Sequence, residues 1–196
     1  LADGDSPTGR RVLLDGKSRS EGNAATTGSS LVAQLSQNMN FVIDLKVGEF
    51  LRLHAESRGV TEIVETTRST LEAANSLAGE PFDESTPVTA LSGGQSRALM
   101  IADTAIISRS PIVLIDEIEN AGIDRSRALE LLTGAEKIVL MATHDPLLAL
   151  RASRRLVISE GGVRQIVYRS DAEAAALERL TKIDETIQRC RSIIRF

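Results

Sequence analysis

Two short apolar runs in the second half of the chain place the strongest constraint on its fold. Residues 112–115 read Ile-Val-Leu-Ile, and residues 138–142 read Ile-Val-Leu-Met-Ala. Strands that are apolar on both sides, instead of alternating, are typical of a parallel sheet that is covered on both faces. Residues 125–133 have helical periodicity and separate the two runs. Strands that alternate with helices in this way indicate an α/β core.

The other patterns divide the chain around this core. We expect residues 1–47 and 109–169 to form the core, residues 48–108 a helical insertion, and residues 170–196 a C-terminal helix. The individual elements expected are strands at 11–14 and within 31–42, helices at 47–58, 62–77, 96–108, 125–133 and 146–152, a hairpin of residues 155–159 and 163–168, and a helix over 171–195.

The composition excludes several classes of function. Among the 196 residues, 42% are hydrophobic and 26% are charged, which is ordinary for a globular domain. The net charge of −4 gives no positive field for direct nucleic-acid binding, and a single cysteine cannot form a disulfide framework or a cysteine-based zinc site. No apolar run approaches the ~18 residues of a membrane helix, and nothing near residue 1 resembles a signal peptide. We therefore expect a cytoplasmic protein.

A glycine pair at the start of a predicted helix indicates phosphate binding. The segment reads Leu91-Ser92-Gly93-Gly94-Gln95. Because Gly93 and Gly94 lack Cβ atoms, an anion can approach the backbone N–H groups, and Ser92 adds a hydroxyl donor. The N-terminal end of the following helix contributes unpaired N–H groups and the positive end of the helix dipole. The alternative is a glycine-rich turn that only begins a helix.

Polar residues follow both apolar strands. Asp116 and Glu117 end the first strand, at the edge where ligand crevices lie in parallel α/β sheets. Asp116 suits Mg²⁺, which prefers oxygen ligands, and Glu117 could deprotonate an attacking water. His144 follows the second strand and could hydrogen-bond a transferring phosphate. Taken alone, Asp116 and Glu117 are equally compatible with solvated charges in a turn, and His144 is more typical of a structural histidine at a strand end.

In this order, the three segments resemble the ATP-binding cassette (ABC) ATPases. Leu91–Gln95 is similar to the signature motif of that family, Ile112–Glu117 to its Walker B strand, and His144 to its switch histidine. The resemblance implies a P-loop NTPase-type, mainly parallel sheet with a helical signature subdomain. It also implies ATP and Mg²⁺ as ligands, Asp116 as a metal ligand, and Glu117 and His144 as catalytic residues.

Two further segments extend the resemblance over about residues 5–168. Gln37 is similar to the glutamine of the family's glutamine loop, which implies contact with nucleotide and metal. Asp124 resembles the aspartate of the dimer-contact loop, although that loop is one residue longer here, and Ile118 stands where proline is usual. The resemblance implies that Asp124 and Ser92–Gln95 bind nucleotide in a dimer.

One family motif does not occur in the sequence. The phosphate-binding loop Gly-x-x-x-x-Gly-Lys-[Ser/Thr] is absent, and Gly16-Lys17-Ser18 does not supply it, because the position five before Gly16 is Arg11. In the family this loop lies just upstream of the segment that Leu1 begins. We expect truncation of a complete cassette, and the alternative is a natural chain that receives nucleotide from a partner. The 196 residues alone are then expected to bind ATP poorly.

The resemblance predicts the ATP-binding and ATP-hydrolysing subunit of an ABC transporter. We expect a homodimer or heterodimer that encloses nucleotide between its copies and docks on membrane-spanning subunits at the cytoplasmic face. One alternative is a soluble, non-transport ABC ATPase for DNA repair or translation, and another is a vestigial module without hydrolysis. The transported substrate and its direction are chosen by other subunits and cannot be inferred from this sequence.

The C-terminal segment carries an apolar seam. Its residues recur at spacings of three and four, as in a heptad pattern, and the seam is too short for an independent coiled coil. We expect it to be buried against its own domain or, alternatively, to pair with another helix. The seam residues are Leu180, Ile183, Ile187, Cys190 and Ile194.

Overall fold

The computed structural model describes residues 13–14, 17–18, 31–36, 41–116 and 122–194. A three-stranded parallel sheet in the order β3-β4-β5 forms its centre, from strands β3 (Val32–Leu35), β4 (Ile112–Asp116) and β5 (Ile138–Ala142). The short strands β1 (Leu13–Leu14) and β2 (Lys17–Ser18) form a separate antiparallel pair. The predicted α/β class and the two apolar core strands are confirmed.

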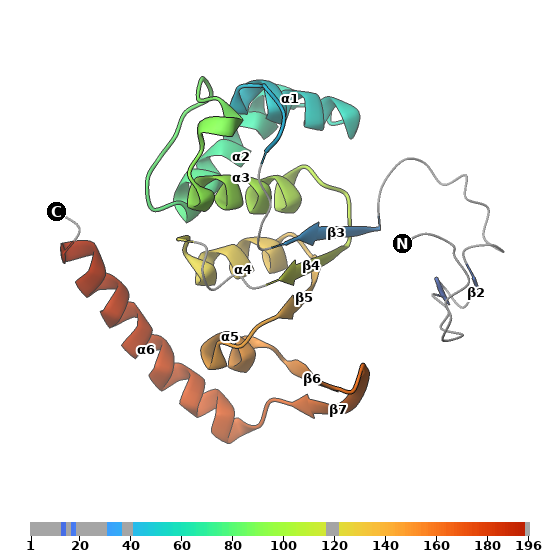
Figure 1. Cartoon of the computed structure of the whole chain (residues 1–196), viewed down its shortest axis with the longest axis vertical. Coiled ribbons are helices and arrows are strands. Elements are labelled where there is room, and N and C mark those ends of the chain that lie inside the picture. Colours follow the sequence, from blue (N-terminus) through green and yellow to red (C-terminus); the bar gives the residue numbers. More distant parts are fainter. Residues whose placement is uncertain (1–12, 15–16, 19–30, 37–40, 117–121, 195–196) are drawn as a thin grey trace.

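Figure 1 shows helices at one end of the molecule, a β-hairpin at the other, and the parallel sheet between them. The helical end contains α1 (Val47–Ser57), α2 (Ile63–Leu77), the 3-10 turn η1 (Val88–Ala90) and α3 (Gly93–Ile106). The elements that follow β4 are α4 (Arg125–Gly134), α5 (Pro146–Arg151), the hairpin β6 (Arg154–Ser159) and β7 (Gly162–Tyr168), and α6 (Asp171–Ile194).

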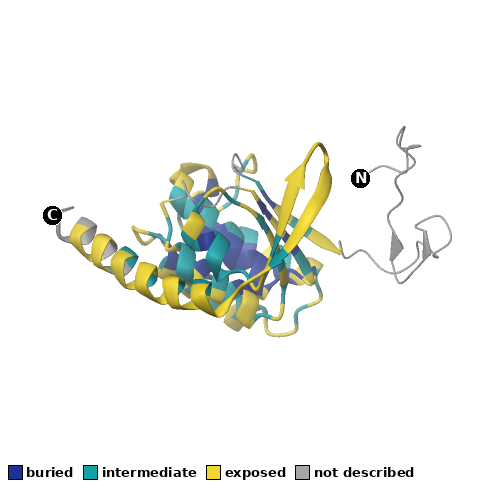
Figure 2. Ribbon diagram, turned by 90° about the horizontal axis from the view of Figure 1, so that it is seen from below, coloured by how far each residue is buried: buried dark blue, intermediate teal, exposed yellow. Residues whose placement is uncertain are grey.

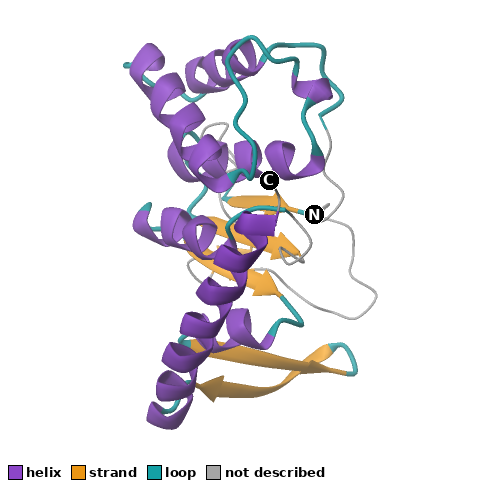
Figure 3. Cartoon of the chain, turned by 90° about the vertical axis from the view of Figure 1, so that its left-hand side faces the viewer, coloured by secondary structure: helices purple, strands orange, loops and turns teal. Residues whose placement is uncertain are grey.

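Helix α3 joins the two halves of the core because it is apolar on two sides. Ala98, Ile101 and Ala105 pack with the sheet and with α4. Leu99 and Ala102 pack with α1, α2 and η1. The first set recurs at helical spacing on one face and the second set on another, so the two clusters share a single buried helix. Figure 3 shows the stacked helices beside the orange strands of the sheet.

Among the described residues, helices cover one face of the central sheet. Strand register places Val113, Ile115 and Leu35 on the face toward α3 and α4, where all three side chains are buried. The opposite face presents Leu114 and Leu140, which are 37% and 44% exposed. A groove of about 2060 Å³ runs along β5 and includes this open face, and residues of α4, α5, β6 and α6 also line it. The prediction of strands that are apolar on both sides is confirmed, whereas the expected burial of both faces is not found in the described residues.

Helix α6 lies along the outside of the molecule and is exposed over most of its length, as the yellow ribbon in Figure 2 shows. Arg155 of β6 holds its first turn through Glu173, with 2.5 Å between Nη2 and Oε1. The seam residues Leu180, Ile183 and Ile187 are 38%, 57% and 45% exposed. The expected burial of the seam against its own domain is therefore not observed for these three residues. Two ion pairs, Arg155 with Glu173 and Arg125 with Asp184, join α6 to the domain.

Candidate functional site

Asp116 and His144 follow neighbouring strands at the same edge of the sheet. Asp116 is the last residue of β4 and lies opposite Ala142, the last residue of β5. His144 stands two residues beyond Ala142, and the side chains of Asp116 and His144 are both exposed. Parallel strands present their carboxyl ends at one edge, so these two groups lie on the same rim of the protein.

A small hollow adjoins this rim. Asp116 lines it together with Ser36, which follows β3, and Arg97 and Met100 of α3. Arg97 lies only about one and a half turns beyond Ser92, at ~5.4 Å per turn, so the hollow is close to the start of α3. Gln37 directly follows Ser36, but Gln37 and Glu117 both lie outside the described residues.

A reciprocal capping box begins α3. The Ser92 hydroxyl accepts a hydrogen bond from the Gln95 backbone N–H at 3.3 Å, and Gln95 Oε1 accepts one from the Ser92 N–H at 2.9 Å. Two backbone donors at the helix N-terminus are thereby satisfied locally. The helix begins at Gly93, three residues before the predicted start at Ser96. The capping box between Ser92 and Gln95 accounts for the earlier start.

Gly93 has no role in the internal packing that would require glycine. A Cβ atom built on it meets no other atom within 4 Å, and its φ is not positive. Gly93 is the first residue of the helix, where neither its packing nor its φ requires a residue of low helix propensity. Open space above the backbone N–H groups of a helix N-terminus allows close approach by an anion.

Asp124 serves as the N-cap of α4. Its Oδ1 accepts a hydrogen bond from the Arg127 backbone N–H at 3.1 Å, and its Oδ2 lies 3.5 Å from Arg127 Nε. The preceding turn contains Gly122, whose φ is 63° and whose built Cβ lies 3.9 Å from Gly94 Cα. The structure therefore brings the Asp124 segment next to the first turn of α3.

The segment around His144 is held by residues that sequence reasoning did not select. Asp145, directly after His144, caps α5 and accepts hydrogen bonds from the N–H groups of Leu147 and Leu148 at 2.8 and 3.4 Å. Its other oxygen, Oδ2, lies 2.6 Å from Arg125 Nη1. The Asp-Pro pair at 145–146, a capping residue before a proline at the first helical position, is a sequence signal for this cap. Arg125 had no such signal, because its partner is 20 residues away.

Comparison with other proteins identifies the family. No family model matches the chain. A curated relative, the uncharacterized ABC transporter ATP-binding protein MJ0121 of Methanocaldococcus jannaschii, is 48% identical over 198 residues, which cover all of this chain and 75% of the relative. The chain belongs to the ABC transporter ATP-binding proteins.

Solved structures support the fold of this ABC protein. An ATP-binding subunit of an ABC transporter is 21% identical, with a TM-score of 0.59 over 76% of this chain and 68% of that one. The ATP-binding cassette MJ0796, described as a dimer in a post-hydrolysis state bound to ADP and Pi, is also 21% identical, with a TM-score of 0.54 over 71% of this chain and 63% of that one. The expectation of a P-loop NTPase-type cassette fold is confirmed.

The described residues supply some of the groups that a nucleotide site needs. The exposed Asp116 carboxylate has the oxygen donors that Mg²⁺ prefers, and the space above Gly93 admits a phosphate. Within the described part of the chain, no three His, Cys, Asp or Glu side chains gather as a metal cluster. A Mg²⁺ ion here would thus keep water and phosphate oxygens among its ligands, as it usually does.

None of the described helices is long and apolar enough to span a bilayer.

Proposed function

We propose that this ABC protein binds and hydrolyses ATP as a dimer, with Ser92–Gln95 of one copy lying over the phosphates held by the other. The observation that carries this proposal is Gly93, where the internal packing leaves open space and requires no glycine. A second molecule that approaches the backbone closely explains this choice of residue. The curated relative, named as an ATP-binding protein, supports the same ligand.

The proposed roles follow from residue chemistry at the rim. Asp116 holds Mg²⁺, directly or through water, and the ion supplies charge stabilisation to the phosphates. Glu117 accepts the proton of the attacking water, and His144 donates a hydrogen bond to the γ-phosphate as charge develops on it. Gln37 contacts nucleotide and metal, and Asp124 contributes to the nucleotide site from the dimer-contact segment. These roles make up a hydrolysis site shared between two copies.

The proposed partners are the membrane-spanning subunits of a transporter. The helical region 48–108 is the proposed docking subdomain, and the core 1–47 with 109–169 is the proposed hydrolytic part. This arrangement places the chain at the cytoplasmic face of the membrane. The relative's name, which includes the word transporter, supports this assignment over a non-transport ATPase.

A pair of glycine variants tests the proposal. The phosphate-binding loop is absent from the sequence, so the assay uses a chimera of this chain with the quarter of the relative that lies outside the match. Gly93→Ala should raise the free energy of unfolding by up to about 1 kcal/mol and abolish ATP-dependent dimerisation and hydrolysis. Gly134→Ala in α4 is the matched control, because its Cβ also meets nothing within 4 Å. If Gly93→Ala hydrolyses ATP as fast as Gly134→Ala, the proposal is wrong.

A second variant tests the general base. Glu117→Gln keeps the shape of the side chain but cannot accept the proton of water, so the chimera should accumulate as an ATP-bound dimer. Size-exclusion chromatography with ATP and Mg²⁺ measures the trapped dimer, and phosphate release measures turnover. Turnover by Glu117→Gln at the parent rate would assign the base to another residue. The 196-residue chain itself should bind ATP only weakly in calorimetry, since the lysine and backbone cradle are absent.

A further inference from the structure

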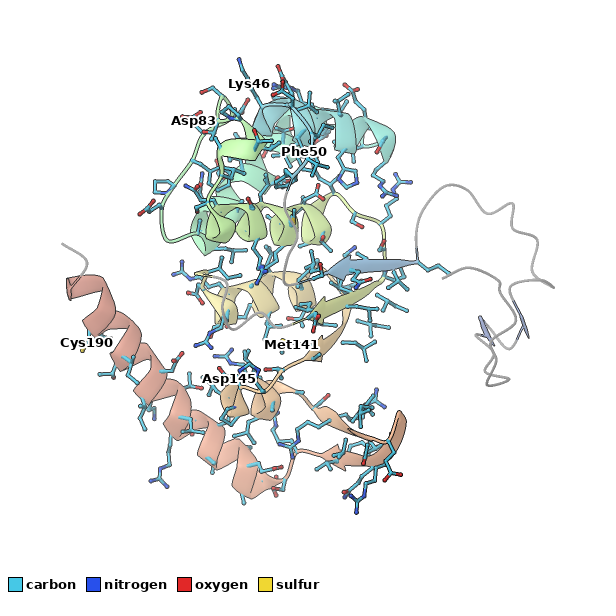
Figure 4. The ribbon with its side chains drawn as sticks, in the orientation of Figure 1. Lys46, Phe50, Asp83, Met141, Asp145 and Cys190 are labelled. Carbon is cyan, nitrogen blue, oxygen red and sulfur yellow. The ribbon has the colours of Figure 1, made fainter. Side chains whose placement is uncertain are left out.

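Arg125 joins three segments that are distant in sequence. It is the first residue of α4 and directly follows Asp124. Its Nη1 donates to Asp145 Oδ2 at 2.6 Å, next to His144, and its Nη2 lies 3.7 Å from Asp184 Oδ1 on α6. Figure 4 shows Asp145 at the start of α5, in the region between α4 and α6.

The three charged side chains are largely shielded from water. The exposed fractions are 20% for Arg125, 18% for Asp145 and 29% for Asp184. Some ion pairs of the chain are much more exposed: Arg68 and Glu65 are both more than half exposed, and such a pair contributes little. An arginine that is shielded between two carboxylates restricts the positions of both carboxylates, because its planar guanidinium directs N–H groups to each of them.

Asp145 links Arg125 to the segment that carries His144. Its Oδ1 is committed to the N-terminus of α5, and its backbone N–H donates to Thr143 Oγ1 at 3.0 Å. His144 is therefore flanked on both sides by residues in a closed hydrogen-bond network. Arg125 connects this network to α4 and α6.

We propose that Arg125 is a positioning residue that sets the His144 segment against the Asp124 segment, and that α6 takes part through Asp184. The value of this positioning for hydrolysis rests on the proposed function. The contact itself does not, since it joins residues of this chain alone. The middle of α6 thereby acquires a role: the charged contact of Asp184 braces the rim of the site.

The test uses nuclear magnetic resonance on the 196-residue chain without nucleotide. The chain has two histidines, so the ring signal that disappears in His144→Gln identifies His144 and leaves that of His54. Arg125→Ala should shift the His144 ring signal, leave the His54 signal in place, and speed amide exchange of Leu147 and Leu148 roughly tenfold or more. Unchanged His144 and α5 signals in Arg125→Ala would overturn the proposal.

Arg155→Ala is the matched control for a purely structural effect. Arg155 is 22% exposed and also pairs with a carboxylate of α6, but its partner Glu173 is in the first turn. It should lower the melting temperature without moving the His144 signal. If Arg155→Ala and Arg125→Ala perturb His144 equally, the effect is general loosening of α6 and the proposal fails.

Two conservative variants separate geometry from charge. Arg125→Lys keeps the positive charge, but an ammonium group does not reproduce the planar fork, so the His144 signal should stay displaced. Full restoration by lysine would show that charge alone acts and would contradict the positioning role. Asp184→Asn should shift His144 less than Arg125→Ala, and no shift at all would remove α6 from the proposal. These outcomes do not depend on ATP hydrolysis, so they distinguish failure here from failure of the proposed function.

Discussion

The two faces of the central sheet have similar sequences and different surroundings. On β4, Val113 and Ile115 point toward α3 and α4 and are 0% and 4% exposed. Between them, Leu114 points to the groove on the other face and is 37% exposed. Alternate residues of one apolar strand thus meet a packed core and an open groove. Side-chain chemistry sets the preference for burial, and the availability of a neighbouring element decides whether burial occurs.

The largest expected contrast is between adjacent residues of β4. Ile115→Ala should lower the free energy of unfolding by about 2–5 kcal/mol, because it removes buried methyl groups and leaves a cavity on the closed face. Leu114→Ala should cost less than about 1.5 kcal/mol, since its side chain is partly solvated and borders open space. Urea denaturation of both variants measures the difference. Equal losses would show that the groove is filled in solution.

The fold was largely predictable from periodicity and turn residues. The two apolar strands, the helices of the insertion and the hairpin around Gly161-Gly162 are found close to the predicted bounds. The open face was not predictable, because a fully apolar strand has the same sequence whether one or two of its faces are covered. The same reason explains the exposed seam of α6, whose spacing indicates an apolar face but not the element that covers it.

The candidate site was predictable where its signal is local. Gly93, Asp116 and His144 stand out because each occurs at a helix start or a strand end. Contacts between residues that are far apart in the sequence could not be predicted from it. His54 is an example: its Nδ1 lies 2.6 Å from Asp103 Oδ1, a partner 49 residues away. Arg125 was overlooked for the same reason.

An intermediate effect on the free energy of unfolding is expected at Lys137, which contacts the connection between α3 and β4. The Lys137 ammonium donates to the carbonyl oxygens of Ser108 and Ser110 at 2.6 and 3.0 Å. Lys137→Met keeps the apolar stem and removes both hydrogen bonds, so we expect a loss of about 1–2 kcal/mol in the free energy of unfolding. A loss as small as that of Leu114→Ala would mean that these carbonyl groups are satisfied by water.

The effect of Lys137 should depend on pH. Burial lowers the pKa of the Lys137 side chain in the folded protein. Just below the ordinary lysine pKa of about 10.4, the unfolded chain then binds more protons at this position than the folded chain. The stability of the parent relative to Lys137→Met should therefore rise with pH through this range. A relative stability that is flat or falls between neutral and alkaline pH would contradict burial of the ammonium.

The smallest effect on stability is expected at Ile138, which is more exposed than the other large apolar residues of the open face, Leu114 and Leu140. Ile138 is 61% exposed and begins β5 with its side chain toward the groove. Ile138→Thr keeps the β-branched shape that favours a strand and replaces the ethyl group with a hydroxyl that water can reach. The free energy of unfolding should change by less than about 0.5 kcal/mol, whereas fluorescence of a hydrophobic dye bound to the groove should fall.

Val113→Thr is the control on the closed face, where the added hydroxyl is buried and should cost about 1–3 kcal/mol. If both threonine variants are equally destabilised, Ile138 is covered in solution, and the contrast between the two faces does not hold at the edge of the sheet.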